Sequence, residues 1–156
     1  MTAAGHPSRI TSHESRPFSW SVRVYHEDVD GSGLVYHANY LKFLERARTE
    51  WLRALGFEQT ELAARHGVAF VVRSLSIEYE KPASFNDALT VTVQLAELKG
   101  GQILLEQAIA RGGEALARAG VRIACVNTAS LRPVRIPDSI AEALGRCIAG
   151  FPQDPR

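Results

Sequence analysis

Two different periods of apolar and polar residues divide the first third of the chain. Over residues 18–24 apolar side chains occupy every second position, which is the period of a half-buried β-strand. After Tyr36 the spacing becomes helical, and an apolar stripe runs along residues 40–55 opposite a charged face. This stripe predicts a long central helix, with Asn39 as its N-cap and Gly56 as its C-terminal cap.

Residues 68–129 alternate again and are divided by glycine pairs, which is typical of strands joined by tight turns. The alternation changes parity near Arg73 and Ser74, where a β-bulge is expected. Consecutive strands with such turns predict an antiparallel meander. The expected strands cover residues 68–80, 89–95, 103–109 and 115–128, and shorter helices are expected over 59–65 and 139–148.

These elements predict a two-layer α+β domain with a five-stranded antiparallel sheet and one long helix. One helix covers only one face of such a sheet, yet the last strand also carries Ala124 and Val126 on its second face. That apolar surplus predicts a homo-oligomer. The domain is expected to span residues 18–137, after a polar, disordered extension over 1–17 and before a short helix and tail over 138–156.

The composition is that of a folded soluble protein, with 46% hydrophobic and 22% charged residues. A formal net charge of +1 gives no electrostatic case for binding nucleic acid. No apolar run approaches the ~20 residues of a membrane span, and residues 1–17 lack the apolar core of a secretory signal. Cys125 and Cys147 are too few for a disulfide framework and lack zinc-site spacing. We therefore expect a cytoplasmic protein with reduced cysteines.

Chemically versatile side chains concentrate where the first strand gives way to the long helix. Asp30 lies in a loop with two glycines, and His37 follows just before the helix. A helix N-terminus presents unpaired N–H groups and a positive dipole end, which stabilise a developing oxyanion. A carboxylate held beside it can act as a nucleophile or general base, so this combination suits acyl transfer. The other acids of the loop, Glu27 and Asp28, are expected to be solvated.

The segment VRVYHEDVDGSGLVYHANYLKFLERAR, residues 22–48, resembles the hotdog-fold acyl-CoA thioesterases of the 4-hydroxybenzoyl-CoA thioesterase family. It is most similar to the branch associated with the Tol–Pal system, and the resemblance extends through FVVR at 70–73 and EYEKPA at 78–83. It implies an α+β hotdog fold, in which the sheet wraps around the central helix. It also implies hydrolysis of acyl-CoA without a metal or other cofactor, by a homodimer or homotetramer.

The resemblance also implies roles for individual residues. Asp30 matches the catalytic carboxylate, and His37 matches the histidine whose backbone N–H polarises the thioester carbonyl in relatives. His26 departs from the tyrosine that is usual in this branch. The candidate substrate-binding residues are Tyr36, Tyr40, His26, Gly33 and Arg73.

Other interpretations stay open at this point. Asp30 could be a turn former, and His37 could be a histidine near a helix end without a functional role. A hotdog hydratase or dehydratase would instead use a helix carboxylate paired with a histidine, which makes Glu45 the reserve candidate. The protein could also bind acyl-CoA or an acyl-carrier protein without catalysis. A calcium loop beginning at Asp28 is disfavoured, because Asn39 stands where that loop requires a bidentate carboxylate.

Overall fold

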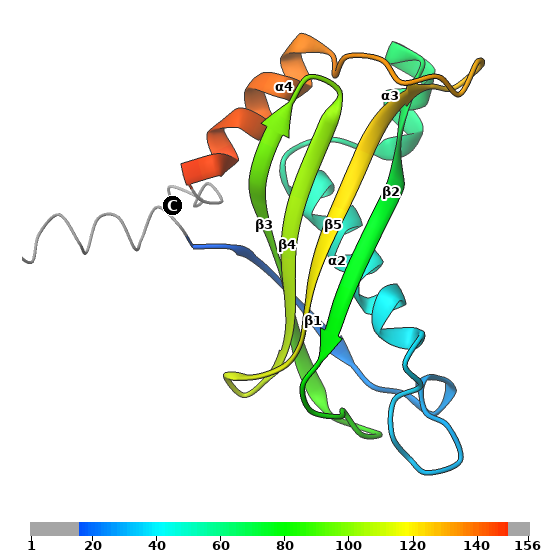
Figure 1. Ribbon diagram of the computed structural model, residues 1–156, viewed down its shortest axis with the longest axis vertical. Coiled ribbons are helices and arrows are strands. Elements are labelled where there is room, and N and C mark those ends of the chain that lie inside the picture. Colours follow the sequence, from blue (N-terminus) through cyan, green and yellow to red (C-terminus); the bar gives the residue numbers. More distant parts are fainter. Residues whose placement is uncertain (1–15, 150–156) are drawn as a thin grey trace, which may run out of the picture.

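The computed structural model describes residues 16–149. Most of the expected N-terminal extension and the tail over 150–156 therefore lie outside the described residues. A five-stranded sheet forms one layer and a long helix packs against one face of it (Figure 1). The strands are β1 (Phe18–Arg23), β2 (Val68–Tyr79), β3 (Ala88–Lys99), β4 (Gln102–Arg111) and β5 (Glu114–Asn127). The helices are α2 (Asn39–Ala54), α3 (Gln59–His66) and α4 (Asp138–Gly145), with short 3-10 segments η2 (His26–Asp28) and η3 (Arg146–Ala149).

The strand order across the sheet is β1-β3-β4-β5-β2, and every pairing is antiparallel. The predicted α+β class is thus confirmed. The predicted meander is wrong in one respect, because β2 pairs with β5 at the far edge rather than with β3. Glycine turns join only β3, β4 and β5 in series, whereas residues 80–87 carry the chain from one edge toward the other. The predicted bulge is confirmed by a register shift between Val72 and Ser74.

Helix α2 packs its apolar stripe against the sheet and forms the centre of the core. Its buried apolar residues are Tyr40, Phe43, Leu44, Ala47, Trp51 and Leu52. Gly56, which follows the helix, has φ +98° and confirms the expected left-handed end. The predicted N-cap is wrong, because the helix begins at Asn39 itself and no side chain caps it. The Asn39 side-chain amide instead donates a hydrogen bond to Asp28, which precedes the helix by eleven residues.

The candidate residues of the loop lie at one end of the molecule. The loop between β1 and α2 is at the opposite end of the sheet from α3 and α4 (Figure 1). Its neighbours there are the end of β2 and residues 80–87 between β2 and β3. Within residues 16–149, no helix combines the length and the apolar character needed to cross a bilayer.

Candidate active site

The Asp30 carboxylate stands exposed at a tight turn. Its Oδ1 accepts hydrogen bonds from the Ser32 hydroxyl and from the Ser32 backbone N–H, the latter at 2.8 Å. These bonds hold the pKa of Asp30 below its ordinary value, so the carboxyl is ionised at neutral pH. The turn closes through Gly33, whose N–H donates to the Asp30 carbonyl at 3.0 Å. Gly33 has φ +84°, a conformation that side chains with a Cβ rarely adopt.

The chain that enters α2 leaves a backbone donor unused at His37. The Asn39 N–H donates to the Tyr36 carbonyl at 2.8 Å, which begins the first turn. No described residue accepts a hydrogen bond from the His37 N–H. The His37 carbonyl, in contrast, accepts a bond of 2.7 Å from the Tyr79 hydroxyl at the end of β2. Tyr79 of β2 thus holds the peptide group between His37 and Ala38 in place. The free N–H of His37 lies next to it, near the positive end of the α2 dipole.

Asp28 is not the solvated loop charge that the sequence predicted. Asp28 is only 3% exposed. Its Oδ2 accepts a bond of 2.8 Å from the Tyr25 N–H, and its Oδ1 accepts a bond of 2.9 Å from the Asn39 side-chain amide. A buried carboxylate is tolerated when donors replace its hydration, and these two donors do so here. Glu27, in contrast, is exposed as expected.

The substrate-binding candidates are only partly brought together. Tyr36 is exposed, and its ring lies 4.5 Å from the His37 ring. Tyr40 is 3% exposed, and its hydroxyl accepts a bond of 3.0 Å from the Ala83 N–H, so it holds residues 80–87 against the helix. His26 is exposed and stacks on Phe85, with ring centroids 4.0 Å apart.

Arg73 is the candidate that the structure does not bring to the loop. It lies at the bulge of β2, six residues before Tyr79, the residue that contacts His37. At the rise of an extended strand this separation is about 20 Å. Glu45 is also remote from the loop, because it lies six residues into α2 from Asn39, which is about 9 Å along the helix axis. It lines a separate cavity of about 110 Å³ between α2 and the sheet.

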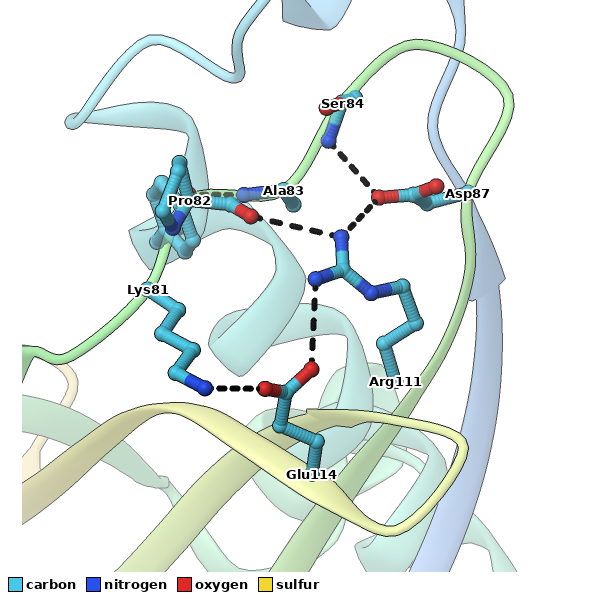
Figure 2. Close-up of polar contacts among 8 residues, drawn as sticks. Lys81, Pro82, Ala83, Ser84, Asp87, Arg111 and Glu114 are labelled. Atoms are coloured by element: carbon cyan, nitrogen blue, oxygen red, sulfur yellow. Dashed lines mark hydrogen bonds and ion pairs between the residues drawn. The ribbon is translucent and has the colours of Figure 1, made fainter.

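A charged network fastens residues 80–87, which in turn support the Asp30 loop. Figure 2 shows Arg111 bridging Asp87 and Glu114, while Lys81 bonds to the other oxygen of Glu114. Burial acts to raise the pKa of Asp87, but the Ser84 N–H and Arg111 outweigh burial and keep it below its ordinary value. Lys81 and then Arg111 lower the pKa of Glu114. The fastened segment bonds to the loop, since the Phe85 N–H donates to the Gly33 carbonyl at 3.2 Å.

We expect Arg111→Met to lower the melting temperature at pH 7, and we expect this difference from wild type to shrink in acid. Both carboxyl pKa values lie below the ordinary 3.8 and 4.5 in the folded protein. Their contribution to stability is therefore present above those ordinary values and is lost as the pH falls through the lowered ones. Thermal unfolding at pH 7 and at about pH 2.5 measures the difference.

The matched control for this prediction is Arg118→Met. Arg118 pairs with Glu80, and both side chains are well exposed, at 63% and 42%. Such a surface pair contributes little to stability, so Arg118→Met should lower the melting temperature less than Arg111→Met does. If Arg111→Met lowered the melting temperature by the same amount at both pH values, the prediction would be contradicted.

Three residues at the site were missed or misjudged from the sequence: Asp28, Tyr79 and Phe85. In the sequence Tyr79 is only one residue of an alternating strand, but in the structure its contacts with Tyr40 and His37 place it beside the start of α2. The signal that could have identified these residues is their polar or aromatic character in, or next to, the segments that connect the regular elements. Among residues 16–149 no group of three potential ligands could hold a metal ion.

Comparison with known proteins places the chain in a family. A profile of the thioesterase-like superfamily matches residues 24–144. The chain is 46% identical over 126 residues to the acyl-CoA thioesterase YbgC of Haemophilus influenzae, covering 81% of this chain and 93% of that protein. It is 42% identical over 124 residues to the acyl-CoA thioester hydrolase YbgC of Escherichia coli O157:H7, covering 79% and 92%.

Solved structures agree with the sequence relatives. The crystal structure of a probable thioesterase from Bartonella henselae matches with a TM-score of 0.75 and 40% identity, covering 78% of this chain and 99% of that chain. The superfamily profile spans well over half of this chain, and these relatives match along most of its length. The resemblance inferred from the loop and helix motif is thereby confirmed, and the chain belongs to the thioesterase-like superfamily with the hotdog fold.

Proposed function

We propose that this protein hydrolyses acyl-CoA thioesters to a free acid and CoA. The observation that carries the proposal is that one connection, between β1 and α2, carries both an exposed, ionised Asp30 and a free His37 N–H just before the helix. The sequence relatives named as acyl-CoA thioesterases and thioester hydrolases support the same chemistry. The substrate is accordingly an acyl-CoA. The free and buried state of Cys125 and Cys147 suits the reducing cytoplasm in which we place the reaction.

In this proposal the thioester carbonyl oxygen accepts a hydrogen bond from the His37 N–H. Charge that develops on this oxygen in the tetrahedral intermediate is stabilised by that donor and by the helix dipole. Asp30 acts in one of two ways, both of which its exposure allows. It attacks the carbonyl carbon to form an anhydride that water then hydrolyses, or it takes a proton from the water that attacks. Collapse of the intermediate breaks the C–S bond and releases the CoA thiolate, which takes up a proton.

A panel of acyl-CoA thioesters tests the proposal on the wild-type protein. Free thiol is measured over time for short, medium and long saturated chains and for aromatic acyl groups. We expect thiol release from at least one class, well above the rate without enzyme. The absence of thiol release from the whole panel, by a folded protein, would contradict the proposed function.

We also propose that two or more copies assemble through the edge of the sheet. The long strand β2 forms one edge of the sheet, so its outer backbone groups have no neighbouring strand among residues 16–149. Val71, Val72 and Tyr79 on this strand are 42%, 48% and 46% exposed. A long edge strand with exposed apolar side chains favours pairing with another chain. Such pairing would cover these apolar side chains and would bring residues of a second copy beside the exposed Asp30 loop.

We expect light scattering at micromolar concentration to give at least twice the 17.1 kDa mass of one chain. Replacing Val72 with Lys should shift the mass toward the monomer, because an edge lysine opposes strand pairing. Glu97→Lys on β3, at an exposed position away from that edge, is the control and should leave the mass unchanged. A wild-type mass of one chain would refute the proposed assembly.

A further inference from the structure

Asp28 is a buried carboxylate that the proposed mechanism does not use. It sits two residues before Asp30 and contacts both ends of the segment that carries His37. Through its carbonyl it accepts a bond of 2.9 Å from the Tyr36 N–H. Through its carboxylate it accepts a bond of 2.9 Å from the Asn39 amide. The two bonds hold the residue before His37 and the residue two positions after it.

The same residue is also anchored on the side of the first strand. Its N–H donates to the Tyr25 carbonyl at 3.0 Å, and its Oδ2 accepts from the Tyr25 N–H at 2.8 Å. These bonds form the η2 turn, which directly precedes the Asp30 loop. Asp28 therefore links three parts of the site: the end of the first strand, the turn that carries Asp30 and the first residue of α2.

We propose that Asp28, paired with Asn39, is a positioning residue that sets the placement of the Asp30 carboxylate relative to the His37 N–H. This inference rests on the proposed thioesterase function. The carboxylate and the N–H act on the same carbonyl group, one at carbon and the other at oxygen, so their separation must match a single substrate geometry. Misplacement by about 1 Å can lower a rate by about a hundredfold, even when it arises away from the reacting atoms.

The choice of an asparagine at the start of α2 follows from this role. Its side chain does not cap the helix; it donates to Asp28. An aspartate at position 39 would repel the Asp28 carboxylate, and an alanine would leave one carboxylate oxygen buried with no donor from the helix. The two residues thus form a matched donor and acceptor pair that holds the helix start against the loop.

The kinetic test uses four variants measured against the wild type on an acyl-CoA that the wild type hydrolyses. Asn39→Ala and Asn39→Asp should each lower kcat by about tenfold or more while KM changes by less than about threefold. The exchanged double variant Asp28→Asn with Asn39→Asp restores a donor facing an acceptor and keeps an acceptor for the Tyr25 N–H. It should recover a large part of the kcat lost in Asn39→Asp. Glu27→Gln, at the neighbouring exposed acid, should match the wild type.

Amide hydrogen exchange supplies a readout that does not depend on turnover. In Asn39→Ala the N–H groups of Tyr36 and Gly33, which donate to Asp28 and Asp30, should exchange faster, while strand amides of β4 and β5 keep their protection. Unchanged exchange at Tyr36 and Gly33, or unchanged kcat in Asn39→Ala, would overturn the inference. The inference would also be overturned if the double variant did not recover any of the kcat lost in Asn39→Asp. It would likewise be overturned if the strand amides of β4 and β5 lost their protection together with kcat, because either result indicates a purely structural role.

The two proposals fail in distinguishable ways. A wild-type protein that releases no thiol from any acyl-CoA overturns the proposed function, and the positioning role of Asp28 falls with it. A wild-type protein that is active, with variants at position 39 that are equally active, overturns only the positioning role of the Asp28–Asn39 pair.

Discussion

Asp30→Asn should lower the rate of thiol release from acyl-CoA by about 10²–10⁴-fold, the usual contribution of a positioned carboxylate. Asparagine has nearly the shape of aspartate, and its amide oxygen can still accept the Ser32 N–H that bonds to Asp30 Oδ1 at 2.8 Å. The turn should therefore keep its geometry while the group loses its negative charge. An amide is too weak a nucleophile and too weak a base to replace the carboxylate in either form of the mechanism.

Initial rates of thiol release, together with circular dichroism and a CoA-binding measurement, check this expectation. The control is Asp138→Asn, which changes an exposed aspartate at the start of α4, at the opposite end of the sheet. The control should retain the wild-type rate, and both variants should remain folded and bind CoA. Undiminished turnover in Asp30→Asn would refute the assignment of Asp30.

The same variant separates the proposed hydrolysis from its alternatives. A hydratase of this fold would depend on a helix carboxylate, so Glu45→Gln rather than Asp30→Asn would abolish its activity. The structure gives this alternative little support, because Glu45 lies about 9 Å along α2 from Asn39 and lines a separate cavity. A protein that binds acyl-CoA without catalysis would retain binding in both variants and show no thiol release in the wild type.

Local sequence patterns predicted the elements of this fold because each pattern reflects a local geometry. The two-residue period of the strands, the helical stripe over residues 40–55 and the parity change near Arg73 all correspond to observed features. Strand order was harder to predict, because pairing of β2 with β5 joins segments about fifty residues apart. No turn between them encodes that pairing. It depends on how the whole sheet covers α2, which a local pattern does not contain.

The sequence predicted that the candidate residues of the loop lie near the start of the long helix, but it did not predict how their surroundings differ. Asp28 and Asp30 are alike in the sequence, and both stand in a loop before a helix. Their environments differ because the η2 turn directs the Asp28 side chain inward to Tyr25 and Asn39, while Asp30 faces solvent beside Ser32. A single residue type at two nearby positions therefore has two different surroundings. Only the hydrogen-bond partners, one of them eleven residues away, distinguish these surroundings.

Trp51→Ala should lower the free energy of unfolding by about 3–5 kcal/mol, the range for removing a large buried aromatic side chain. Trp51 is 2% exposed and lies on the inner face of α2, next to the cavity of about 110 Å³. Removing the indole enlarges an existing void, and the helix is held by strand contacts that limit its collapse into the space. Because the total free energy of unfolding of a domain is only about 5–15 kcal/mol, the variant should be close to unfolding at 37 °C.

The second of the chain's 2 tryptophans supplies the control. Trp20 on the edge strand β1 is 38% exposed, so Trp20→Ala removes less buried area and leaves no enclosed void. Urea unfolding of both variants should show the larger fall in midpoint for Trp51→Ala, and equal falls would contradict the prediction. Trp51 lies about 18 Å along the helix from Asn39, and Asp28 and Tyr79 hold the start of α2 independently of it. The folded fraction of Trp51→Ala at low temperature should therefore keep a kcat close to that of the wild type.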